Sequence, residues 1–154
     1  MIFKDEIMLE PGIHKASLVE VKSEFGKTDR REKMIESLEV WIGYFQNKIG
    51  NDNILGLYID GSFATNIDIL TGVDARPEDI DVIVELRSED ILEANRLDIC
   101  EVYDYTLDIK YTYPDDEWNS IWWTAFENVN LKDRHIYNKN DKKGYIELVD
   151  WRKP

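Results

Sequence analysis

Five residues have the types and the order that metal-dependent phosphate chemistry requires. Gly61 and Ser62 follow one apolar run of the chain, and Asp79 and Asp81 stand one residue apart where the next apolar run begins. Carboxylates are the protein ligands that Mg²⁺ takes, usually together with waters and substrate phosphates. A Gly-Ser pair at the start of a helix offers backbone N–H groups and a hydroxyl to a phosphate. With Asp108 on a later strand, these parts suit the transfer of a nucleotidyl group.

The positions of these acids follow from the pleat of two expected strands. Side chains alternate faces along a strand, so Asp79 and Asp81 share the polar face of a strand over residues 79–86 whose other face is apolar. Asp108 lies on the polar face of a second strand, expected over 106–113. If these two strands are neighbours, the three carboxylates converge.

Simpler interpretations exist for each of these residues. Asp79 and Asp81 could be acids at a strand end that face solvent, and Asp108 could pair with Lys110 in a surface ion pair of little energetic value. Ser62 could act as the N-cap of a short helix, a role worth about 1 kcal/mol, and this role is compatible with binding a phosphate.

The pattern of apolar residues and turn signals predicts one domain over residues 1–154, with an N-terminal arm over 1–27 that holds at most a short helix. Thr28 or Asp29 would cap a long amphipathic helix that ends near Gly50. Ser88 would cap a helix to about residue 97, and a further helix would start after Pro114. Strands are expected over 54–60, 79–86, 106–113 and 144–149. The expected fold class is α/β (α+β), with a mixed sheet of about four strands and helices mainly on one face.

Charge and composition limit the partners. The chain carries 32 acidic and 19 basic residues and a net charge of −13, which argues against extended DNA binding, because that needs a basic surface. A nucleotide remains possible, since a bound divalent ion reverses the local field of an acidic pocket. A protein or short RNA partner also remains possible.

The compartment is expected to be the cytoplasm. The single cysteine, Cys100, cannot form an internal disulfide, and residues 1–10 lack the basic and apolar regions of a secretory signal. No apolar run reaches the roughly 18 residues that a membrane span requires. We therefore expect no membrane contact.

The order of these motifs resembles the nucleotidyltransferase superfamily typified by DNA polymerase beta and the minimal nucleotidyltransferases. Asp79-Ile80-Asp81 is similar to its paired metal ligands, Gly61-Ser62 to its phosphate-binding turn, and Asp108 to its third carboxylate. The longer stretches 60–65, 11–14 and 143–146 further resemble a little-characterised bacterial and phage family assigned to that superfamily. The link from Gly61 to Asp79 is several residues longer than usual, so residues 66–76 resemble an insertion.

The resemblance implies a nucleotidyltransferase fold and a Mg²⁺- or Mn²⁺-dependent enzyme that transfers a nucleoside monophosphate from an NTP. The acceptor would be a tRNA, a protein or a small molecule. Asp79, Asp81 and Asp108 would hold the metal, and Asp108 would also assist deprotonation of the acceptor hydroxyl. Gly61 and Ser62 would hold phosphates. The alternative is a protein of this fold without turnover that binds another protein, such as an antitoxin or a phage or host-defence component.

Other chemically notable residues have ordinary interpretations beside functional ones. A triphosphate needs a cation in addition to metal, and Lys143, beside the last expected strand, is the candidate. The ordinary interpretation of the basic pairs, Arg30-Arg31 among them, is that their charges are solvated. Trp118 and Trp122 could stack on a base but lie on an apolar helix face. His14 and His135 form no metal or triad signature and are interpreted as structural or surface residues.

Overall fold

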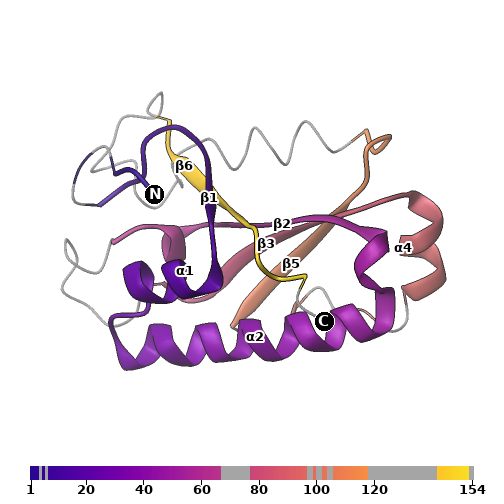
Figure 1. The fold of residues 1–154 in the computed structure, drawn as a ribbon, viewed down its shortest axis with the longest axis horizontal. Helices are drawn as coiled ribbons and strands as arrows, with labels where there is room; N and C mark the ends of the chain where they lie inside the picture. Colours follow the sequence, from indigo (N-terminus) through magenta and orange to yellow (C-terminus); the bar gives the residue numbers. More distant parts are fainter. Residues whose placement is uncertain are drawn as a thin grey trace.

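The chain forms a mixed sheet flanked by helices in the computed structural model (Figure 1). The structure describes residues 1–3, 5, 7–66, 77–96, 99, 102–103, 106–117 and 142–152. Most of the expected insertion, the helix expected after Pro114 and the predictions made for Cys100, Trp118, Trp122 and His135 lie outside the described residues.

Six strands of the described residues form one sheet in the order β1-β6-β2-β3-β5-β4. Their bounds are β1 Gly12–Ala16, β2 Ile54–Asp60, β3 Ile80–Leu86, β4 Val102–Tyr103, β5 Leu107–Thr112 and β6 Gly144–Leu148. The central strand β3 is antiparallel to β2 and parallel to β5, and β1 is parallel to β6. The sheet is therefore mixed, as expected.

Three α-helices of the described residues have bounds that their sequence signals explain. They are α1 Leu18–Phe25, α2 Asp29–Ile49 and α4 Glu89–Asn95. The predicted cap of α2 is confirmed, because the Thr28 side chain accepts a hydrogen bond from the Arg31 N–H, and the helix ends at Gly50. Gly50 has a φ of 89°, a conformation that favours glycine at a helix end.

The core lies between the sheet and helices α1 and α2, which run along one face of the sheet in Figure 1. The alternation predicted for β3 is confirmed: its apolar face buries Ile80, Val82, Val84 and Leu86 in this core. The opposite face carries Asp81 and Ile83, and Ile83 packs with Tyr58 and Tyr145. The acidic end of β3 therefore lies on the sheet face turned away from α1 and α2.

Two expectations need correction. The sheet has more than about four strands because the N-terminal arm contributes β1, whose short run of mixed residues gives a weak signal, and because the two-residue β4 is too short to detect. Ser62 is not a helix cap: Gly61 holds that position before a short 3-10 helix, η2 Ser62–Ala64, and no side chain caps it.

Within the described residues, no helix combines the length and apolar character that crossing a bilayer demands.

Candidate metal and phosphate site

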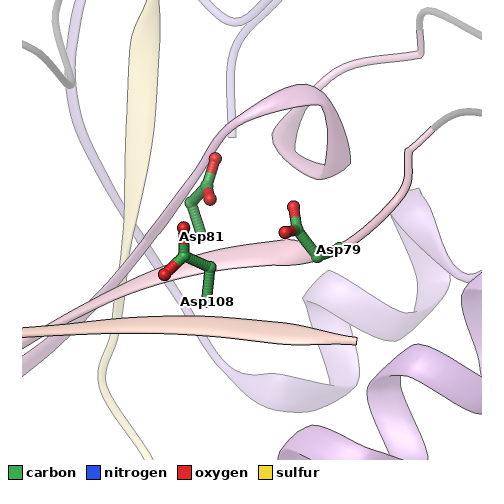
Figure 2. Close-up of side chains that lie close together, drawn as sticks. All are labelled: Asp79, Asp81 and Asp108. Carbon is green, nitrogen blue, oxygen red and sulfur yellow. The ribbon is translucent and has the colours of Figure 1, made fainter. Parts of the chain in front are cut away.

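Three carboxylates predicted to converge lie together at one end of the sheet. One oxygen from each of Asp79, Asp81 and Asp108 lies within 4.8 Å of the others, and all three side chains are partly buried. Figure 2 shows the three carboxylates side by side, with Asp79 immediately before β3, Asp81 on β3 and Asp108 on β5. The arrangement predicted from the pleat of the two strands is confirmed.

Strand register explains why these acids meet. Asp81 is the direct partner of Asp108 in the parallel β3–β5 ladder and of Asp60 in the antiparallel β2–β3 ladder. Partners in adjacent strands point to the same face. Three strands thus present a row of carboxylates, Asp60, Asp81 and Asp108, and Asp79 lies two residues before Asp81 on the same face.

The Gly61-Ser62 turn lies directly against this row. Gly61 has a φ of 78°, which an L-residue rarely adopts, and a Cβ atom at this position would overlap Oδ2 of Asp81 and lie 3.0 Å from its Cγ. Glycine is therefore needed both for the turn and for room beside the carboxylate. The short helix η2 follows at once, so the backbone of this turn and the acid cluster are adjacent.

The electrostatics of Asp81 reflect its crowded surroundings. The pKa of Asp81 is raised to about 7: burial is the largest cause, the neighbouring carboxylates of Asp79, Asp60 and Asp108 follow in that order, and Lys143 opposes the shift. Like charges at this spacing disfavour the ionised form. A cation bound among these groups would relieve the repulsion.

Asp60 differs from the other three carboxylates because it is buried and paired with a lysine. It is 5% exposed, Lys143 is 4% exposed, and the Lys143 Nζ donates a hydrogen bond to Asp60 Oδ1. Burial raises the pKa of Asp60 to about 6 in spite of this cation and of a backbone hydrogen bond from Gly61. The pairing of Asp60 with Lys143 was not predicted from the sequence. The only available signal was the pleat, which places Asp60 on the same sheet face as Tyr58, two residues earlier.

Asp108 combines both interpretations offered for it. Its Oδ1 lies 3.4 Å from Lys110 Nζ in a half-exposed ion pair. One of its carboxylate oxygens also lies within 4.8 Å of oxygens of Asp79 and Asp81. An exposed ion pair of this kind contributes little to stability. The pairing with Lys110 therefore does not remove Asp108 from the candidate metal ligands.

Two neighbouring arginines, Arg30 and Arg31, donate hydrogen bonds to backbone carbonyls of the segments beside the site. Arg31 is 3% exposed and donates hydrogen bonds to the carbonyls of Phe63 at 2.9 Å and Thr65 at 2.8 Å, just after the Gly61-Ser62 turn. Arg30 donates from its Nε to the carbonyl of Pro77 at 2.8 Å, two residues before Asp79. The basic pairs were expected to be solvated, and this expectation is wrong for Arg31, which is buried.

The donor set fits a hard divalent cation. Its ligand atoms are all carboxylate oxygens, the preference of Mg²⁺ and Mn²⁺ rather than of softer metals, which favour sulfur or imidazole. Asp79, Asp81 and Asp108 are the residues that would hold the ion. Such an ion would supply positive charge to the oxygens of a bound phosphate.

The fold and the site together define a mixed α/β protein with a cluster of three carboxylates beside a glycine turn. Residues 1–149 match a family described as one of unknown function, DUF6932, and the chain belongs to that family. No curated protein and no solved structure matches the chain.

Proposed function

We propose that this protein is a metal-dependent nucleotidyltransferase, which transfers a nucleoside monophosphate from an NTP to an acceptor hydroxyl. The observation that carries the proposal is the convergence of Asp79, Asp81 and Asp108 beside the Gly61 turn. The proposal includes a nucleotidyltransferase-like fold, on the resemblance of the Gly-Ser turn and the paired acids, with Mg²⁺ or Mn²⁺ as cofactor.

Each residue has a role that its position allows. Asp79, Asp81 and Asp108 hold the divalent ion, while the Gly61 turn and the Ser62 hydroxyl contact phosphates. The acceptor oxygen bonds to the α-phosphorus, the bond from that phosphorus to the bridging oxygen breaks, and pyrophosphate leaves. The proton of the acceptor hydroxyl passes to Asp108. Positioning and charge neutralisation supply most of the catalysis in such a site.

The decisive experiment tests covalent transfer. The protein is incubated with cell lysate, Mg²⁺ or Mn²⁺ and each NTP labelled at its α-phosphate, and label attached to RNA, protein or small molecules is separated and counted. The proposal predicts transfer that needs the divalent ion and yields pyrophosphate, and the labelled fraction identifies the acceptor. A variant with Asp79→Asn and Asp81→Asn should lose at least about a thousandfold in rate, since removing one strong electrostatic contact already costs about 10²–10³ in other enzymes.

A matched control separates loss of the site from loss of charge. Asp52 and Asp115 are exposed acids outside the cluster, so Asp52→Asn plus Asp115→Asn removes the same charge and should leave transfer within about twofold. Wild-type protein that transfers no label with any NTP, and gains no thermal stability from NTP with metal, would contradict the proposal.

The net charge of −13 favours a second candidate, a non-catalytic protein of this fold that binds another protein, such as an antitoxin or a phage or host-defence component. An acidic surface suits a basic protein partner. This candidate predicts a stable complex that purifies with the protein and is unchanged by the Asp79→Asn and Asp81→Asn substitutions.

A further inference from the structure

The buried pair of Asp60 and Lys143 lies next to the candidate metal ligands but differs from them in kind. Its carboxylate is almost fully buried, whereas Asp79, Asp81 and Asp108 are partly buried. Asp60 stands directly opposite Asp81 in the β2–β3 ladder and is bonded to the Lys143 ammonium. Four carboxylates therefore lie in this corner of the sheet, and one of them already has a cation.

The backbone around Lys143 fixes where its side chain starts. The N–H of the next residue, Gly144, donates to the carbonyl of Leu9 at 3.2 Å, and a Cβ at position 144 would lie only 2.7 Å from His14 Nε2. His14 Nε2 is itself hydrogen-bonded to the carbonyl of Glu10 at 2.7 Å. The N-terminal segment and β1 thus pack closely against the start of β6, the strand that directly follows Lys143.

We propose that Asp60 and Lys143 form a charge-compensating positioning pair for the metal site. Lys143 keeps the Asp60 carboxylate out of the ligand set, and Asp60 keeps the Lys143 ammonium from repelling a divalent ion beside Asp81. This inference rests on the proposed metal site, and it replaces the expectation that Lys143 binds a phosphate directly.

The two charges have opposite effects on an ion at Asp81, and this gives the pair a distinctive signature. Asp60→Asn leaves the Lys143 charge without its carboxylate partner, and an uncompensated cation at such short range in a partly buried site strongly opposes a divalent ion. Lys143→Met in the same chain removes that charge with a side chain of similar length. A defect caused by the first substitution should therefore be corrected by the second.

The test measures Mn²⁺ affinity by isothermal titration calorimetry at pH 8, first alone and then with ATP present. Asp60→Asn should weaken Mn²⁺ binding by about tenfold or more, from the Coulomb repulsion at this range. The double variant Asp60→Asn plus Lys143→Met should return to within about threefold of wild type, with and without ATP. Lys110→Met is the matched control, because Lys110 also lies near the cluster but is half-exposed. Added to Asp60→Asn, it should not restore binding.

The outcomes separate the pair from the site. Wild-type protein that binds no Mn²⁺ contradicts the proposed function itself. Wild-type binding with an unaffected Asp60→Asn variant, or a double variant about tenfold weaker than wild type, overturns only the pair. A double variant that binds Mn²⁺ normally but loses ATP about tenfold would also overturn it, because Lys143 would then be a phosphate ligand. The double variant carries no unpaired charge, so it can still overturn the pair if Asp60→Asn alone fails to fold.

Discussion

Gly61 lies so close to Asp81 that a single methyl group between them would overlap the Asp81 carboxylate. Gly61 directly follows β2 and Asp81 lies on β3, 20 positions further along the chain. Their proximity places the turn expected to bind phosphate beside the acids expected to bind metal. Glycine at position 61 is thus a requirement of the site as well as of the turn.

Gly61→Ala should damage both stability and metal binding. The alanine would combine a φ of 78° with an overlap of Asp81 Oδ2, so we expect the free energy of unfolding to fall by about 2 kcal/mol or more and Mn²⁺ binding to be lost. Chemical denaturation and calorimetric titration measure the two effects. Gly43→Ala is the control: this position lies inside α2, and an added Cβ there meets nothing within 4 Å. It should raise stability by up to about 1 kcal/mol. Equal losses from both substitutions would contradict this account.

The acid cluster should make the metal-free protein less stable as pH rises. The pKa of Asp81 is about 7 in the folded protein, against an ordinary 3.8, so between these values the folded state holds a proton that the unfolded chain has released. Stability therefore falls as pH rises through this window. The raised pKa of Asp60 acts in the same direction up to about pH 6. Thermal unfolding in chelator from pH 5 to 8 should show this decline.

Asp81→Asn should flatten that decline and, at pH 8 in chelator, raise the free energy of unfolding by about 1–3 kcal/mol, because it removes a desolvated charge among like charges. Mn²⁺ should stabilise wild type more at pH 8 than at pH 6, and this difference should vanish in Asp81→Asn. Stability that rises with pH in the metal-free wild type, with a slope removed by Asp81→Asn, would refute the interpretation.

Arg31 should be among the costliest side chains of α2 to remove. Its guanidinium satisfies the buried carbonyls of Phe63 and Thr65, so Arg31→Met leaves these acceptors unpaired and should cost about 2–4 kcal/mol of unfolding free energy. Urea denaturation provides the measurement. Lys33→Met, at an exposed position of the same helix, should change stability by less than about 0.5 kcal/mol. A loss no larger for Arg31→Met than for this control would show that its hydrogen bonds contribute little.

Two helix N-caps provide an internal comparison. The Thr28 side chain accepts a hydrogen bond from the Arg31 N–H, whereas Ser88 before α4 makes no side-chain cap bond. Thr28→Ala should therefore cost about 1 kcal/mol, and Ser88→Ala less than about 0.5 kcal/mol, both by urea denaturation. The reverse order would mean that cap geometry does not set these contributions.

Local patterns predicted much of this structure from the sequence. The pleat of residues 79–86 predicted that Asp79 and Asp81 lie on one face, and the apolar period and caps of α2 predicted its two ends, because such features depend on near neighbours in the chain. The buried pairing of Asp60 with Lys143 spans 83 residues. It depends on which strands become neighbours, and no local pattern encodes that order. The burial of Arg31 was not predicted for the same reason, since two of the carbonyls that it binds, those of Phe63 and Thr65, lie more than 30 residues away.

The place of β6 in the sheet has a consequence for the newborn chain. β6 lies between β1 and β2, and it is the partner through which β1 joins the described sheet. Until residues 144–148 have been synthesised and have left the ribosome, β1 therefore has no neighbouring strand in this sheet and one edge of β2 is unpaired. The Asp60 carboxylate also lacks its ion-pair partner, Lys143. Open strand edges are where chains associate wrongly. The period between synthesis of β2 and release of β6 is thus when the unpaired edges of this chain are most open to wrong association.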